Sequence, residues 1–195
     1  MTAPAAKAHA LHLGIAEAGK LHALAHRHAE ALRHYREALR RAVATRAPEV
    51  FFRHYTQCVL ECLEQMGSYG EVIEFCERAD AHYRAHGHQM ELQRRDHAAL
   101  LERLGAVRAK AGQAGPAAEA LRAAIALVPK GTLPLAEELL GWLNRRLTPD
   151  PTRIAMAQTR RGYFTVTRDQ VDPARARPLP ADPTPPNAGA PPLFG

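Results

Sequence analysis

The sequence predicts an all-α fold made of pairs of packed helices and followed by a proline-rich tail. Aromatic residues make up only 6% of the 195 residues while alanine is plentiful, a composition that favours closely packed helices. Apolar residues recur at helical spacing through most of residues 5–147. Ten of the 15 prolines lie beyond residue 148, so the character of the chain changes there. A chain of this length accommodates one domain and a tail.

Seven helices are expected before this change, each with a face of apolar residues at helical spacing. They cover residues 5–25, 28–44, 48–65, 68–86, 89–111, 116–128 and 133–147. The turn between the first two contains no strong helix breaker, so its position is the least defined. The seventh is apolar on one side and charged on the other, which suits a helix that covers the end of a stack.

Several boundaries have local signals. Pro48 suits the first turn of a helix, where its missing N–H costs little. Ser68 followed by Glu71 is typical of a capping box, in which the two side chains satisfy free N–H groups at a helix start. Gly87 and Gly112 follow the last apolar residues of their helices and are expected to stop them.

Residues 101–129 contain the clearest helix pair. Gly105 in the first helix and Ala117 and Ala124 in the second are small, and they occupy the positions where the two helices would touch. The helices are separated by a break that contains Gly112 and Pro116. One such pair cannot bury its apolar faces alone, so similar pairs are expected elsewhere in the chain.

Two further stretches repeat this pattern. Three pairs begin at Ile15, Thr56 and Leu101, so their starts lie 41 and 45 residues apart (15 to 56 to 101). Each has a small residue, a larger one four positions later and another small one three positions after that. The three sets are Ala31–Tyr35–Ala38, Val72–Cys76–Ala79 and Ala117–Leu121–Ala124.

These repeats resemble the tetratricopeptide repeat, and the resemblance covers residues 8–147. The third copy matches the signature at Leu101, Leu104, Gly105, Gly112, Ala117, Leu121, Ala124 and Pro129. The first departs from it with His22 where an aromatic is usual and His26 where glycine is usual. The spacing also exceeds the family's roughly 34 residues, so extended helices or turns are expected. The resemblance implies a helical solenoid of three pairs and a closing helix.

The resemblance also implies a concave groove, lined by the first helix of each pair, that binds an extended partner segment. The implied groove residues are Lys20, His54, Gln57, Glu61, Glu64, Glu102, Arg103 and Lys110. The middle is acidic with one amide and the ends carry cations, unlike the basic clamps with which some members hold acidic C-termini. A basic segment is the better match, and the protein's own tail, with Arg160, Arg161 and Arg168, is one candidate. Alternatively, these charges form a solvated face.

The sequence predicts three parts: a helical repeat domain over residues 1–147, an extended aromatic and basic segment over 148–172, and a proline-rich, largely disordered tail over 173–195. Tyr163, Phe164 and Val166 are costly to leave together in water, so they are expected to dock on a partner's sheet edge or on the protein's own helices. The tail itself is a passive linker or a short binding motif that ends in PPLFG.

Neither a metal site nor a cofactor is expected, and no catalytic motif is found. His22 and His26 are four apart, as are His82 and His86, a spacing that places each pair on one helix face without a third ligand. Three cysteines are too few for a disulfide framework and fit reduced thiols inside helices. There is no phosphate-binding glycine loop or nucleophile elbow, so the protein is expected not to be an enzyme.

The function predicted from these features is non-catalytic protein binding, as a scaffold or adaptor such as an assembly factor, a secretion chaperone or a complex subunit. The bound partner could also be a second copy of this protein or the protein's own tail. The alternative is a nucleic-acid-associated regulator that uses the basic helix 28–44 and the arginines of the tail. Pairing of that helix with the acidic second repeat explains the same charges. With no secretory signal or membrane-length apolar run, a cytoplasmic, bacterial-type protein is expected.

Overall fold

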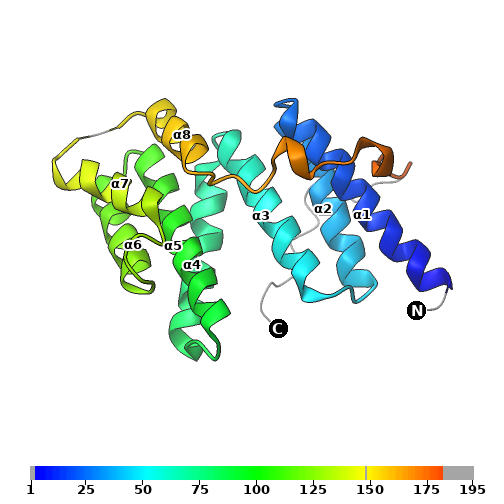
Figure 1. The fold of residues 1–195 in the computed structure, drawn as a ribbon, viewed down its shortest axis with the longest axis horizontal. Coiled ribbons are helices and arrows are strands. Elements are labelled where there is room, and N and C mark those ends of the chain that lie inside the picture. The colour runs from blue at the N-terminus through cyan, green and yellow to red at the C-terminus, as the bar shows by residue number, and fades with distance from the viewer. Residues whose placement is uncertain (1–2, 148, 182–195) are drawn as a thin grey trace. The chain divides into compact units, whose positions relative to one another are not determined.

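A computed structural model describes residues 3–147 and 149–181, with side chains from residue 9 onward. These residues form helices and irregular segments without a strand, so the all-α prediction is confirmed (Figure 1). The helices are α1 (Ala3–Leu24), α2 (His28–Ala44), α3 (Glu49–Gln65), α4 (Tyr69–His86), α5 (Glu91–Lys110), α6 (Ala114–Ala126), α7 (Pro134–Asn144) and α8 (Pro151–Arg160). Two 3-10 turns follow, η1 (Arg168–Gln170) and η2 (Pro173–Arg175).

The chain divides into two compact units. Unit 1 contains Met1–Gly67 and the segment from Thr165 onward, and unit 2 contains Ser68–Phe164. The C-terminal segment therefore belongs with the first three helices. The expected boundaries at residues 147 and 172 do not coincide with this division, and the second predicted helix pair has one helix in each unit.

The core of unit 1 forms where α1, α2 and α3 meet. Its buried residues are Ile15, Ala16, Ala38, Leu39, Ala42 and Tyr55. Gly19 of α1 allows a close approach to α2, since a Cβ at this position would lie 2.9 Å from Cε1 of Tyr35. Tyr35 itself is fully buried. Small residues on one helix thus make room for a large side chain on the next.

Unit 2 is built around the α5–α6 pair, as the small residues of the sequence predict. A Cβ at Gly105 would lie 2.5 Å from Cγ of Leu121 and 3.2 Å from the carbonyl oxygen of Ala117. Helices α7 and α8 extend the same core. Its buried residues are Ala106, Ala109, Ala117, Leu121, Leu135, Ala136, Leu139, Trp142, Ile154 and Ala157.

Most helices end on a residue with a left-handed backbone. Gly67, Gly87 and Gly112 have φ of 77°, 70° and 76°, a conformation that glycine adopts without a steric cost. His26 and Arg46 adopt it without being glycine, with φ of 57° and 49°. His26 thus occupies the turn position at which the repeat signature has glycine. The left-handed backbone of a non-glycine residue costs roughly 1 kcal/mol of conformational free energy.

The capping of α4 and the presence of α8 differ from the prediction. Helix α4 begins directly after Ser68, but the Ser68 side chain makes no capping hydrogen bond, so the expected capping box is wrong. Residues 151–160, expected to be extended, form α8. Its start carries the usual signals: the Asp150 side chain accepts from the Arg153 N–H, and Pro151 occupies the first turn. The extended segment therefore begins only after Arg161.

The substitution Gly105→Ala tests the close approach of α5 and α6. An alanine favours a helix interior by about 1 kcal/mol over glycine. Here the added methyl group would overlap Leu121, so we expect a net loss of about 1–3 kcal/mol in the free energy of unfolding in urea. Gly115→Ala in α6 is the control, because its Cβ would meet nothing within 4 Å. Equal stabilities of the two variants would contradict this packing.

A buried histidine joins α1 to α3. The Nδ1 atom of His12 lies 2.8 Å from the Tyr55 hydroxyl, and its Nε2 atom lies 3.0 Å from Nδ1 of His9. His12 is fully buried. Burial and the neighbouring His9 lower the pKa of His12 to about 4, so its neutral form is the one that packs.

Unit 1 should lose stability in mild acid because of His12. In the unfolded chain a histidine takes up a proton near pH 6.5, whereas folded His12 resists protonation until about pH 4. The contribution is complete above pH 6.5 and is lost as the pH falls toward 4. We expect His12→Gln to lower stability at pH 7 but to lose less of it between pH 7 and pH 4.5 than the wild type, measured by urea unfolding. Equal losses would show that His12 is not the group responsible.

Candidate peptide-binding face

The C-terminal part of unit 1 lies across the helices α1 and α3. We call residues 165–179 the strap, and Figure 1 shows it in orange, passing over α3 and α1. The strap alternates extended residues, such as Thr167 and Val171, with the turns η1 and η2. We call the covered surface of α1 and α3 the strap face.

Two buried glutamates on the strap face hold the strap by its backbone. Oε1 of Glu61 in α3 accepts a hydrogen bond from the Thr165 N–H at 2.8 Å. Oε1 of Glu17 in α1 accepts one from the Asp172 N–H. Glu61 is 6% exposed and Glu17 is 9% exposed. A buried carboxylate needs hydrogen-bond donors, and here main-chain amides of the strap supply them.

A cation lies beside these carboxylates. Nζ of Lys20 is 3.0 Å from Oε2 of Glu17 and donates to the carbonyl oxygen of Gln170 at 3.4 Å. His54 of α3 is half-buried, and its pKa is lowered mainly by burial and further by Lys20. The strap face therefore offers an acceptor to an amide and a donor to a carbonyl, the two groups that every peptide unit presents.

The end of the strap packs on the α1 backbone at Gly14. The Arg177 N–H donates to the Gly14 carbonyl oxygen at 2.9 Å. A Cβ at Gly14 would lie 2.5 Å from Cγ of Arg177 and 2.9 Å from the carbonyl oxygen of Arg175. Farther on, Leu179 packs against the unit 1 core. Glycine is thus required at position 14 for the strap to approach the helix this closely.

Two of the predicted groove residues of unit 1 lie on this face. Lys20 and Glu61 contact the strap directly. His54 is near Lys20, Gln57 is half-buried, and Glu64 is buried. Sequence reasoning missed two residues, Glu17 and Gly14. Glu17 could have been found, because it lies one helical turn before Lys20 on the same face, whereas Gly14 carries no such signal.

The other predicted groove residues belong to unit 2. Glu102 accepts a hydrogen bond at 2.9 Å from the Ala136 N–H in the first turn of α7. Burial raises the pKa of Glu102, while this hydrogen bond and Arg103 lower it. Lys110 is buried. Glu102 is thus engaged in holding α7, a role that the groove prediction did not anticipate.

The predicted docking residues have different surroundings. Tyr163 packs against the unit 2 core, and the Arg103 guanidinium lies 4.9 Å from the centre of its ring. Phe164 meets Tyr163 edge to face, with ring centres 5.2 Å apart. Val166 is half-buried in the strap. Tyr163 thus lies on the protein's own helices with Phe164 beside it, while docking on another protein stays a prediction.

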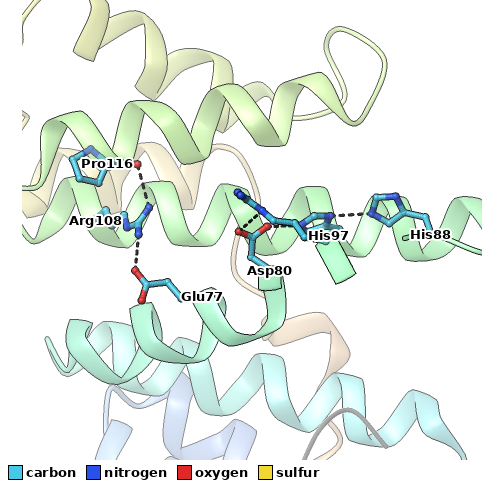
Figure 2. A network of polar contacts seen from close by, with 7 residues as sticks. Glu77, Asp80, His88, His97, Arg108 and Pro116 are labelled. Atoms are coloured by element: carbon cyan, nitrogen blue, oxygen red, sulfur yellow. Dashed lines mark hydrogen bonds and ion pairs between the residues drawn. The ribbon is translucent and has the colours of Figure 1, made fainter. Parts of the chain in front are cut away.

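A second polar network links α4 to α5 in unit 2 (Figure 2). Nε2 of His97 lies 2.8 Å from Oδ1 of Asp80, and its Nδ1 lies 2.9 Å from Nε2 of His88. Burial lowers the pKa of His97 and Asp80 opposes this, so we assign a neutral ring that donates to Asp80 and accepts from His88. Tyr83 stacks on the same ring at 4.6 Å. This arrangement connects two helices and the intervening loop.

The histidine and cysteine pairs do not assemble a metal site. Within residues 3–147 and 149–181, no three His, Cys, Asp or Glu side chains are placed to hold an ion. His26 lies beyond the end of α1 in a left-handed turn, so it does not share a helix face with His22, contrary to the spacing argument. Cys58 and Cys62 are buried, and burial raises the pKa of Cys62 to about 12. Such thiols are poor nucleophiles.

The arginines of α2 pair within their own helix. Glu37 is bound by Arg40 at 2.8 Å and by Arg41 at 2.6 Å. Glu30 is bound by Arg33 at 3.1 Å. These pairs account for three of the arginines that suggested a nucleic-acid surface, through neighbours three and four residues away on α2. The expected partner, the acidic second repeat, is not needed to account for these three arginines.

Comparison with protein-family models, curated proteins and solved structures found no match. The resemblance to tetratricopeptide repeats therefore stays a prediction from sequence positions. In the described part of the chain, no helix combines the length and apolar character required to cross a membrane.

Glu61 offers a direct test of how the strap is held. Glu61→Ala removes the acceptor of the Thr165 N–H, whereas Glu61→Gln keeps an oxygen at that position. A hydrogen bond to a charged group is worth about 1.5–3 kcal/mol, so amide hydrogen exchange at Thr165 should accelerate roughly tenfold or more in the alanine variant. The glutamine variant should show a smaller increase. Equal exchange in the wild type and Glu61→Ala would contradict the role of Glu61.

Proposed function

We propose that this protein is a non-catalytic scaffold whose strap face binds an extended polypeptide segment. The observation that carries the proposal is the pair of buried glutamates that accept backbone N–H groups from the strap. Side chains that satisfy main-chain amides hold a segment in place with little demand on its sequence. The strap is the segment bound in this structure, and it serves as the template for the binding mode.

The charges of the face favour a neutral or basic segment. Two carboxylates, Glu17 and Glu61, lie buried beneath the strap and hold its backbone, and Lys20 pairs with Glu17. An acidic segment would bring a further carboxylate close to these buried groups, at an electrostatic cost. The strap itself contains three arginines and two aspartates over residues 165–177, a net charge of +1 (three minus two). This balance supports the predicted preference for a basic partner.

Cutting the strap free of the rest of the chain tests whether the face binds a segment without a covalent link. A recognition sequence for a specific protease, inserted between Phe164 and Thr165, allows the folded full chain to be cleaved. We expect the released C-terminal fragment to stay with the body during size-exclusion chromatography at micromolar concentration. Combining Glu17→Ala with Glu61→Ala should release it, since two charge-assisted hydrogen bonds are lost.

Glu138→Ala is the matched control for this experiment. Glu138 binds Arg160 and Arg161 in unit 2 and makes no part of the strap face. Retention should therefore be the same with and without that substitution. Immediate loss of the fragment from the cleaved wild-type body would overturn the proposed function.

A further inference from the structure

The strap leaves part of its face unfilled. An open cavity of about 300 Å³ lies between the C-terminal end of α1 and the strap. It is lined by Leu21 and Leu24 of α1, by Ala25 in the turn that follows, and by Arg168, Val171 and Pro173 from the strap.

The lining of this cavity is mainly apolar. Leu21, Leu24 and Val171 are half-buried, and all three border the space. Val171 lies just before Asp172, whose backbone N–H is held by Glu17. A bound segment that keeps this hydrogen bond therefore directs its preceding side chain toward α1 at a defined position.

We infer that the strap face has a subsite for a large apolar side chain in the place of Val171, and that the strap keeps the face closed until a partner segment replaces it. This inference rests on the proposed function, because it assumes that the face binds segments. The partner is an extended, non-acidic segment of another protein that carries Phe, Trp, Leu or a similar residue one position before the amide bound by Glu17.

The strap is suited to being replaced. Its middle is exposed: residues 167–170 and 172–175 lie largely in solvent. It is held by side-chain contacts to backbone atoms at Thr165, Gln170 and Asp172 and by the close contact at Gly14. A segment with the same backbone bonds and a better-filled subsite gains the apolar contact that the strap lacks.

Gly14 provides a way to loosen the strap alone. Gly14→Ala would place a methyl group against the carbonyl oxygen of Arg175 and the Arg177 side chain. A peptide that ends at residue 174 avoids this overlap while keeping the bonds to Glu61, Lys20 and Glu17. The control is Gly141→Ala in α7, which has nothing within 4 Å of the added Cβ. Both substitutions add the same methyl group inside a helix.

The test measures binding of fluorescent peptides to the full-length chain. The peptides span residues 163–174 and carry Val, Phe or Ser at position 171. We expect the Phe peptide to bind roughly tenfold more tightly than the Val peptide and the Ser peptide to bind less tightly, following the apolar area buried. Each peptide should bind the Gly14→Ala chain roughly tenfold more tightly than the wild type or Gly141→Ala, because overlap weakens the competing strap.

Two results would overturn the inference. If the three peptides bind the Gly14→Ala chain with equal affinity, the subsite does not exist. If one peptide binds all three chains with equal affinity, the strap does not compete for the face. Either result leaves the proposed function standing if the cleaved strap is retained. Should Gly14→Ala fail to fold, the full-length variant Val171→Phe replaces it: filling the subsite should slow amide exchange over residues 165–173, and unchanged exchange would again overturn the subsite.

Discussion

Buried glutamates that need hydrogen-bond donors organise both units of this protein. Glu17, Glu61 and Glu102 lie on three different helices, each at 9% exposure or less. Each accepts a backbone N–H from a segment distant in sequence: Asp172, Thr165 and Ala136, respectively. Since an unpaired buried carboxylate is costly, these bonds determine where the strap and the start of α7 lie. Carboxylate-to-amide hydrogen bonds thus position α7 in unit 2 and the strap in unit 1.

This mode of attachment has a consequence for specificity. Backbone amides are common to all segments, so Glu17 and Glu61 select for an accessible main chain more than for particular side chains. Under the proposed function, selectivity would come from the close approach at Gly14 and the apolar cavity beside Leu21 and Leu24. Under the proposed function, the face holds its own strap until a segment that fits better replaces it.

Much of the helical layout was predictable because the signals are local. Apolar spacing and glycine stops located seven helices, most within a few residues of their observed ends. Helix α8 was missed because its apolar positions are few and prolines surround it, although Asp150 and Pro151 marked its start. The capping box at Ser68 failed for the opposite reason: the residue types were right, but the side chain does not turn toward the helix. A short motif shows which local structures are possible, and tertiary packing determines which of them forms.

The sequence by itself determined the helical class and the close contact at Gly105, since periodicity and residue size act within a few turns of a helix, whereas Lys20 and Glu61 were singled out only by the resemblance to a repeat family. Only the tertiary structure decided what those face residues meet. Glu61 and Thr165 are 104 positions apart, and no local pattern joins them. The role of Gly14 likewise depends on the return of the chain to α1, and Glu102 changes from a groove residue to a helix cap because α7 folds onto it. Such contacts depend on the path of the whole chain, which helical periodicity does not encode.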